Sequence, residues 1–404
     1  MSPDGDLAAR DRALPLLGTA LDSSAIAEVV AASRPELGIA AAVATYIRYK
    51  PFTNAIVSYR FTTANGPLLG YAKTVRQGDE PKIAKMVAAG GAGVNGALAV
   101  NLFPTDRELR ALRNLNGSPA RLLERLIPAA GPGAQLRTLR YKPERRYVAA
   151  VETDGHSSVV IRAHTDADYV WARRAAVAFT SNERFTVAGM TAKSDRNRAL
   201  ALQWMPGSPL SYSLADAPVG AVGEALRKLH GTTPRARMRG DGRRRAERSL
   251  LETSALTGWL LPDRAEELDR LTARLVGLIR RSAPQPVPTH GDFSADQVLV
   301  DGSDDRIGII DWDRAAIGDA GWDLGCFLAD LECRAVIGTV DRATVDRCRS
   351  SLLEGYGDGP VTNNGPLLTA AALVARCAEP FRSRRPSWDD EMRAIVDRVA
   401  QLAP

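Results

Sequence analysis

The sequence predicts an α+β protein in which a β-rich first half is followed by a mainly helical second half. Two strand–turn–strand units lie before residue 163, and helical periodicity dominates from Pro209 onward. A short β insertion at 297–310 interrupts the helical half. These observations indicate two lobes, and the length of 404 residues suits two or three domains of roughly 150 residues each.

The composition is that of a soluble globular protein, with 45% apolar and 25% charged residues. No apolar run approaches the roughly 20 residues that cross a membrane. The polar N-terminus lacks the apolar core of a secretory signal. We therefore expect a cytoplasmic protein with no membrane partner. The four cysteines contain no C-x-x-C pair and predict reduced thiols in place of a zinc site.

A short internal echo marks the β-rich half. Residues 47–51 (IRYKP) recur as residues 139–143 (LRYKP), and each copy precedes two extended stretches joined by a turn. Each unit predicts a basic loop, a strand, a turn and a strand. Two copies are too few for a solenoid, so we expect a duplicated β-rich module. The alternative is chance similarity of a short motif.

Helical patterns account for much of the remaining chain. Leucines at helical spacing predict a helix over 106–127, and residues 128–133 (PAAGPG) predict a linker. Residues 219–229 form a periodic run that ends at a stop signal, and residues 250–281 carry two further helical runs. The second half is therefore expected to be built from helices around the short β insertion.

The segment with the clearest chemistry is THGDFSADQVLV at 289–300, followed by GIIDWD at 308–313. Phosphoryl transfer from a nucleotide needs one carboxylate that orients the attacking hydroxyl and accepts its proton. It also needs a second carboxylate that holds Mg²⁺ with the help of an amide oxygen. Asp292 is therefore predicted as the catalytic base, and Asp311 and Gln297 as the Mg²⁺ ligands.

With these residues, the sequence resembles the aminoglycoside phosphotransferase and choline kinase-like family of small-molecule kinases. The similarity continues through residues 316–324 (AIGDAGWDL), where Ala320 replaces the proline of a Gly-Asp-Pro-x-x-Asp-Leu signature. The resemblance implies a bilobal protein-kinase-like fold and ATP as the phosphoryl donor. It also implies that Asp323 binds the catalytic loop from a helix start, where an aspartate also suits an N-cap. His290 is expected to hold the same loop.

The resemblance implies nucleotide contacts at a hinge between the lobes. Residues 200–210 (LALQWMPGSPL) resemble that hinge, at which the carbonyl of Gln203 and the amide of Met205 would meet the adenine edge. In the catalytic segment, Gln297 stands where asparagine is usual, and maltokinase-like relatives carry glutamine there.

The phosphate-binding residues depart further from the family pattern. Arg162 stands at the usual position of the third-strand lysine, while Lys73 ends the corresponding strand of the first copy. Either residue could reach the phosphates, and chain order favours Arg162. The loop at 141–146 has no glycine, so Lys142 is predicted to contact the phosphates in place of backbone amides. The alternative is an exposed basic turn.

Together these features predict three domains. Residues 1–130 would form an N-terminal α/β cap-like domain with a partial duplicate of the N-lobe β unit, similar to the cap of some sugar kinases. Residues 131–205 would form the kinase-like N-lobe, and residues 206–404 the helical C-lobe with the catalytic and metal-binding loops.

The predicted function is ATP-dependent phosphorylation of a hydroxyl on a small polar molecule. The acceptor stays open at this point. An aminoglycoside would favour an acidic pocket, whereas a sugar would stack on an aromatic residue such as Trp312 or Trp388. The acidic candidates are Asp296, Asp313, Glu332 and Glu379.

Two alternatives come from other functional classes. A catalytically inactive nucleotide-binding pseudokinase module is suggested by Arg162 and by the missing glycine loop. A nucleic-acid binder is suggested by the arginine run at 235–248. No aromatic residues interleave with that run to stack bases, so we expect a solvated arginine-rich loop and no nucleic-acid partner. The oligomeric state is left open.

Overall fold

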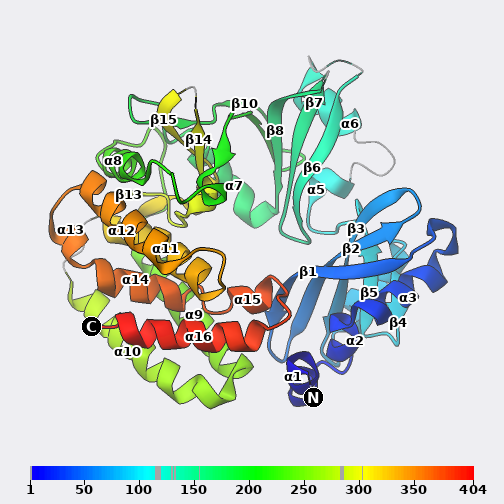
Figure 1. The fold of residues 1–404 in the computed structure, drawn as a ribbon. Coiled ribbons are helices and arrows are strands. Elements are labelled where there is room, and N and C mark those ends of the chain that lie inside the picture. The colour runs from blue at the N-terminus through cyan, green and yellow to red at the C-terminus, as the bar shows by residue number, and fades with distance from the viewer. Residues whose placement is uncertain are drawn as a thin grey trace. The chain divides into compact units, whose positions relative to one another are not determined.

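The computed structural model describes residues 2–113, 120–128, 131, 133–153, 155–282, 286–302 and 304–404. The chain divides into two compact units (Figure 1). The first comprises Met1–Ala167, Ala192–Ala201 and Pro380–Asp389, and the second comprises Asp168–Thr191, Leu202–Glu379 and Asp390–Pro404. Among the described residues, no helix is both long enough and apolar enough to span a membrane.

The first unit begins with helices that pack on a five-stranded sheet of order β1-β2-β3-β5-β4. The sheet forms because runs such as NAIVSYRFTT are rich in β-branched and aromatic residues. The buried hydroxyl of Tyr59 donates to the carbonyl of Ala20 at 2.8 Å and thereby ties the sheet to α2. The elements are α1 (Pro3–Arg10), α2 (Leu17–Leu21), α3 (Ser23–Ser33), β1 (Ala41–Lys50), β2 (Asn54–Thr63), β3 (Gly66–Val75), α4 (Glu80–Ala88), β4 (Ala92–Val94) and β5 (Leu98–Leu102).

A second five-stranded sheet repeats this topology with the order β6-β7-β8-β11-β10. In both sheets a helix, α4 or α7, follows the third strand. The elements are α5 (Arg110–Arg113), α6 (Ala120–Leu126), β6 (Gln135–Lys142), β7 (Arg146–Thr153), β8 (His156–His164), α7 (Asp166–Ala175), β10 (Met190–Ser194) and β11 (Ala199–Gln203). Within the described part of the predicted helix at 106–127, α5 and α6 are helical. Leu115 and half of the predicted linker at 128–133 lie outside the described residues.

The echoed IRYKP and LRYKP segments occupy equivalent hairpins. The prediction of a basic loop is wrong for most of each segment, because the residues before each proline end strands β1 and β6. Only the prolines and the residues that follow them form the turns. Phe52 and Glu144 follow the two prolines and have φ values of 59° and 54°.

An aspartate clamps the first of these hairpins. The Asp11 carboxylate accepts a hydrogen bond from the hydroxyl of Tyr49 at 2.6 Å and another from the amide of Phe52 at 3.0 Å. These bonds give a partner to the buried hydroxyl of Tyr49 and to the amide of Phe52, the residue with positive φ. They therefore stabilise the turn.

The second hairpin carries the same clamp. The Asp106 carboxylate accepts hydrogen bonds from the hydroxyl of Tyr141 and the amide of Glu144, both at 2.8 Å. Its other oxygen accepts from the amides of Glu108 and Leu109. Shared strand order and shared clamps show that the echo marks a repeat of structure and is not a chance similarity.

The second unit is mainly helical, with two small sheets of order β12-β14-β15-β9 and β13-β16. Its helices are α8 (Val219–His230), α9 (Gly242–Leu260), α10 (Ala265–Arg281), α11 (Ala320–Val336), α12 (Arg342–Tyr356), α13 (Pro360–Asn363), α14 (Gly365–Val374) and, from Asp390 onward, α16 (Trp388–Leu402). The short helix α15 (Glu379–Arg382) belongs to the first unit from Pro380 onward. Its strands are β9 (Phe185–Val187), β12 (Ser208–Pro209), β13 (Pro286–Thr289), β14 (Val298–Asp301), β15 (Asp304–Ile309) and β16 (Ala316–Asp319).

The predicted helical runs at 219–229 and 250–281 are confirmed by α8, α9 and α10. The arginine run is the expected loop only at Arg235, Arg237 and Arg239, because α9 begins at Gly242 and the later arginines lie in its first turns. Arg243 binds the end of the next helix, because its guanidinium donates to the carbonyls of Ile279 and Ser282.

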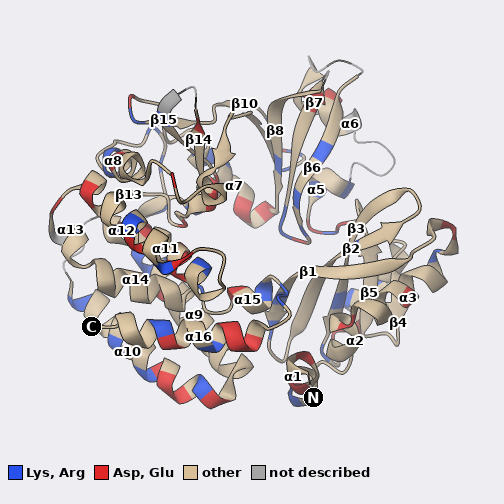
Figure 2. Cartoon of the chain, viewed as in Figure 1, with Lys and Arg blue, Asp and Glu red and all other residues tan. Residues whose placement is uncertain are grey.

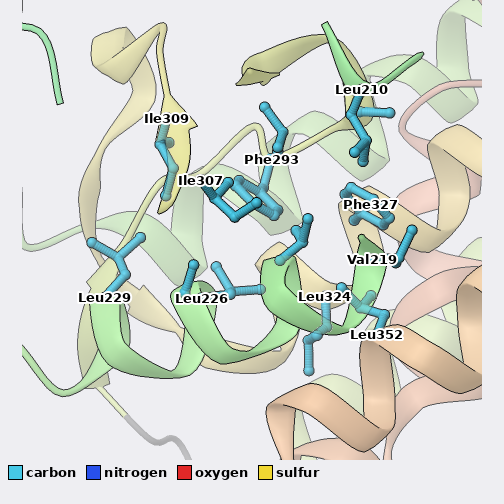
Figure 3. Packing of buried hydrophobic residues seen from close by; sticks show 14 of the residues in the cluster. Leu210, Val219, Leu226, Leu229, Phe293, Ile307, Ile309, Leu324, Phe327 and Leu352 are labelled. Carbon is cyan, nitrogen blue, oxygen red and sulfur yellow. The ribbon is translucent and has the colours of Figure 1, made fainter. Parts of the chain in front are cut away.

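A hydrophobic core supports the catalytic segment of the second unit (Figure 3). Phe293 is fully buried and packs against Phe327 of α11, with ring centroids 5.7 Å apart. Ile307 and Ile309 of β15 point into the same core as Leu226 of α8. Phe293 at one end and β15 at the other therefore fix the catalytic segment to the core. The polar residues between them are held at defined positions.

Candidate active site

The loop predicted to carry the catalytic base, called the catalytic loop below, runs from His290 to Ser294 between β13 and the short helix at Ala295–Gln297. Gly291 has a φ of 80°, and a Cβ atom at this position would lie 2.5 Å from the carbonyl oxygen of Arg314. Only glycine accepts both the conformation and the close approach. The loop consequently lies against the short helix Trp312–Arg314, which follows Asp311.

Asp323 of α11 anchors this loop. Its carboxylate is fully buried and accepts hydrogen bonds from the amides of His290 and Gly291, both at 2.7 Å. His230 of α8 lies 3.2 Å from the same carboxylate and 2.9 Å from the hydroxyl of Tyr356. The predicted structural role of Asp323 is therefore confirmed. The N-cap of α11 is Asp319 instead, which accepts from the amide of Gly321.

His290 joins the loop to the β14–β15 hairpin, as predicted. Its Nε2 donates to the carbonyl of Ile310 at 2.8 Å, since a carbonyl can only accept. The imidazole lies against the rings of Phe293 and Trp312, at centroid distances of 5.6 and 5.0 Å. His290 is thus a buried support for the loop.

Asp292 lies in a strongly cationic environment. Its Oδ2 is 3.5 Å from Nε of Arg314, and the two side chains are 42% and 44% exposed. Burial would raise the pKa of Asp292, but the charges of Arg314 and Arg376 outweigh this and lower it, while Asp311 opposes them. Asp292 is therefore ionised near neutral pH, as a proton acceptor must be.

The β14–β15 hairpin brings Gln297 and Asp311 to the same end. Val298 pairs with Ile309, and the amide of Ile310 donates to the carbonyl of Gln297 at 3.0 Å. Asp311 follows directly, with a φ of 67° that aspartate tolerates better than most residues. The charge of Asp311 acts on Asp292. All three predicted catalytic and metal-binding residues thus belong to one local structure in the second unit.

The hinge-like segment joins the same small sheet. Gln203 ends β11, and its amide donates to the carbonyl of Gly189 at 2.8 Å. The side chain of Met205 lies over Gly308 of β15, because a Cβ there would be 2.9 Å from Cε of Met205. Met205 is therefore packed against the hairpin that carries Gln297 and Asp311.

The two candidate phosphate-binding cations occupy equivalent strand positions. Lys73 of β3 pairs with Ile56, and Arg162 of β8 pairs with Val148. Ile56 and Val148 each lie five residues after the proline of their echo segment. The register therefore makes Lys73 the first-copy counterpart of Arg162.

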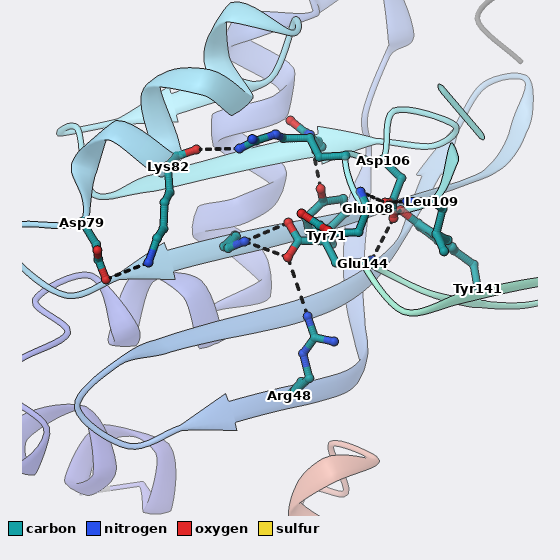
Figure 4. Close-up of polar contacts among 12 residues, drawn as sticks. Arg48, Tyr71, Asp79, Lys82, Asp106, Glu108, Leu109, Tyr141 and Glu144 are labelled. Carbon is teal, nitrogen blue, oxygen red and sulfur yellow. Dashed lines mark hydrogen bonds and ion pairs between the residues drawn. The ribbon is translucent and has the colours of Figure 1, made fainter. Parts of the chain in front are cut away.

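Lys73 is bound by a carboxylate of the other copy. Its Nζ donates to both oxygens of Glu144, at 2.9 and 2.7 Å (Figure 4). Arg48 lies 3.6 Å from the same carboxylate. Glu144 belongs to the turn predicted to face the nucleotide, and the neighbouring Lys142 lies 5.0 Å over the ring of Tyr46. The first copy thus holds the β6–β7 turn through charge and packing.

Replacing Lys73 with methionine is expected to lower the free energy of unfolding by about 2–4 kcal/mol, because Glu144 loses its main partner while buried. The two side chains are only 14% and 6% exposed. Urea denaturation of the single variants and of the Lys73→Met, Glu144→Gln double variant would measure the coupling.

Lys82→Met is the matched control, because Lys82 pairs with Asp79 on the surface and is 56% exposed (Figure 4). It is expected to leave stability nearly unchanged. Equal effects of Lys73→Met and Lys82→Met would contradict the assigned role of the Lys73–Glu144 pair.

The residues proposed for acceptor binding are mostly engaged elsewhere. Trp312 and Trp388 are both buried, so neither offers a free face to a sugar. Asp296 accepts from Ser211 and pairs with Arg334 at 3.0 Å. The fully buried Glu332 is bound by three arginines of neighbouring helices, namely Arg342, Arg349 and Arg398.

Sequence reasoning missed Arg314 and Arg376 as neighbours of Asp292. Arg314 follows Asp311 by three residues and offered a local signal, because it continues the IIDWDR run. Arg376 follows α14 and is brought to the site only by packing of the helices, so the sequence held no comparable signal for it.

Comparison with known proteins identifies the family. Residues 139–361, more than half of the chain, match the model of the phosphotransferase enzyme family. The chain belongs to this family. It is therefore a phosphotransferase enzyme, and the matched region contains the catalytic loop and the hairpin. A search of curated proteins found no match.

Solved structures share the fold of this phosphotransferase. A variant of aminoglycoside 2'-phosphotransferase-IIIa in complex with GDP is 16% identical, with a TM-score of 0.51 over 70% of this chain and 96% of that one. An ethanolamine kinase of Plasmodium vivax is 12% identical, with a TM-score of 0.52 over 74% of this chain and 95% of that one. These similarities support the bilobal protein-kinase-like fold of the phosphotransferase.

Proposed function

We propose that this phosphotransferase uses ATP to phosphorylate a hydroxyl group of a small polar molecule. The observation that carries the proposal is the common local structure of Asp292, Gln297 and Asp311. A hydrogen-bonded hairpin end and a buried aspartate hold these residues in place. The GDP bound to the related 2'-phosphotransferase supports a nucleotide as the donor.

Asp292 acts as the general base. It orients the acceptor hydroxyl and takes its proton as the oxygen bonds to the γ-phosphorus. The bond between the γ-phosphorus and the β,γ-bridging oxygen breaks, and ADP leaves with the electron pair. The lowered pKa of Asp292 keeps the base ionised before the reaction.

Asp311 and Gln297 fit a magnesium ion. Among the described residues, no group of three His, Cys, Asp or Glu side chains could hold a metal. One carboxylate and one amide suit Mg²⁺ all the same, since it keeps several waters and uses few protein ligands. When bound, Mg²⁺ neutralises charge on the phosphates.

The remaining nucleotide contacts are assigned from the family resemblance. Gln203 and Met205 would meet the base through their backbone groups. Arg162 would contact the phosphates, because its counterpart Lys73 is bound by Glu144. Lys142, in the adjoining turn, would supply a second positive charge.

A nucleotide-consumption assay with purified protein, Mg²⁺ and a panel of alcohol acceptors tests the proposal. We expect ATP consumption that depends on acceptor and Mg²⁺, with a product heavier by one phosphoryl group in mass spectrometry. Thermal stabilisation by MgATP without product from any acceptor would instead favour the pseudokinase alternative.

A further inference from the structure

We call four arginines of the second unit the arginine cluster: Arg239, Arg245, Arg314 and Arg376. Arg314 and Arg376 act on the proposed base Asp292, and the charges of Arg239 and Arg314 act on Arg245. Arg314 is 3.5 Å from Asp292 and about half exposed. Arg376 acts on Asp292 electrostatically and lies 3.6 Å from Asp330. The charges of two guanidinium groups therefore act on Asp292, where the acceptor hydroxyl must bind.

The other two members come from the segment that leads into α9. The carbonyl of Arg239 accepts from the amide of Ile317 at 2.7 Å, which holds the segment against β16 just after Arg314. The guanidinium of Arg239 lies 4.9 Å over the ring of Trp171, and that of Arg174 lies at the same distance. Stacking on Trp171 thus fixes the direction of Arg239.

The cluster has unused hydrogen-bonding capacity. Among the described residues, Nε of Arg239 and Nη1 of Arg245 are buried and have no hydrogen-bond partner. Buried N–H groups of this kind usually bind something. Burial lowers the pKa of Arg245, and the charges of Arg239 and Arg314 lower it further, so these groups lie close enough to repel one another.

Nearby carboxylates offset this charge only in part. Asp330 is shared between Arg376 and Arg334, which lies 3.0 Å away. Asp168 and Asp241 favour the charged form of Arg245 but lie at exposed positions. The exposed Glu379 acts on Arg314. Elsewhere in the unit the charges are mixed, as acidic and basic residues alternate along α10 and α16 (Figure 2).

We propose that the acceptor is an alcohol that also carries a carboxylate, sulfate or phosphate group, which the arginine cluster binds. This inference rests on the proposed kinase function and narrows its substrate class. Guanidinium groups match such anions with paired, charge-assisted hydrogen bonds. A polycationic aminoglycoside would meet repulsion here, and Asp296 and Glu332 are already bound by arginines.

Binding of a sugar series that differs only in charge tests the proposal. The probes are glucose, glucosamine, glucuronate and glucose 1-phosphate, measured by calorimetry at low salt with the parent protein and without nucleotide, so that no turnover occurs. We expect glucuronate and glucose 1-phosphate to bind at least about tenfold more tightly than glucose, and glucosamine most weakly. Equal binding of all four probes, no binding of the anions, or preference for glucosamine would overturn the proposal.

Variants of the cluster locate the contact. Arg239→Met and Arg245→Met are each expected to weaken binding of the two anionic probes by about 10- to 100-fold, with binding of MgATP unchanged. Arg244→Met is the control, since Arg244 is an exposed neighbour in α9. Unchanged anion binding, or an equal loss of MgATP binding, would contradict an acceptor site. A failure of the kinase assay with anion binding intact would count against the proposed function alone.

Discussion

Replacing Asp292 with asparagine is expected to lower kcat by about 10²- to 10⁴-fold while the affinity for MgATP stays close to that of the parent protein. The amide keeps the size of the side chain but cannot take the proton of the acceptor hydroxyl. Steady-state kinetics with a productive acceptor and calorimetry with MgATP would separate the two effects.

Asp296→Asn is the matched control for this substitution. Asp296 lies four residues later, is exposed and pairs with Arg334 on the surface. The same chemical change there is expected to leave kcat near that of the parent. Full activity of Asp292→Asn, or an equal loss in both variants, would exclude Asp292 as the base.

Replacing Asp323 with alanine is expected to lower the free energy of unfolding by about 3–5 kcal/mol and to abolish turnover. The substitution removes a fully buried carboxylate that binds two loop amides, and it leaves those amides and Nε2 of His230 without this carboxylate. Urea denaturation and kcat are the two measurements. The loss of activity follows because the loop that carries Asp292 is no longer held.

A milder variant keeps the prediction testable if the alanine variant does not fold. Asp323→Asn retains one acceptor oxygen for the two amides, so both stability and kcat are expected to fall by less. Asp319→Asn is the control in the same helix, because asparagine is as good an N-cap as aspartate. If Asp323→Asn matched the parent as closely as Asp319→Asn does, the anchoring role of Asp323 would be wrong.

The relative position of the three candidate site residues could be predicted because their relation is local. Asp292, Gln297 and Asp311 lie within 20 consecutive residues, and the intervening apolar runs can form only a short hairpin. The pairing of the hairpin strands then places Gln297 and Asp311 at the same end of the hairpin. The role of Asp323 could be anticipated from the family resemblance, and its hydrogen bonds bear this out.

The burial of Trp312 and Trp388 could not be predicted in the same way. A tryptophan after a strand suits either a core or a binding surface, and only the tertiary packing distinguishes them. Trp312 lies between Phe179 and His290, and Trp388 contacts Phe381 and Asp4. Both are therefore parts of cores.

The sequence by itself determined the lobed α+β plan, the repeat of the β module and the spacing of the acidic residues. It did so because strand and helix periods, turns and short hairpins depend on neighbours along the chain. Tertiary structure alone decided that Lys73 pairs with Glu144, that Arg376 acts on Asp292, and that Arg239 and Arg245 lie near Arg314. Such contacts join segments far apart in the chain, and they form only when whole helices and sheets pack together.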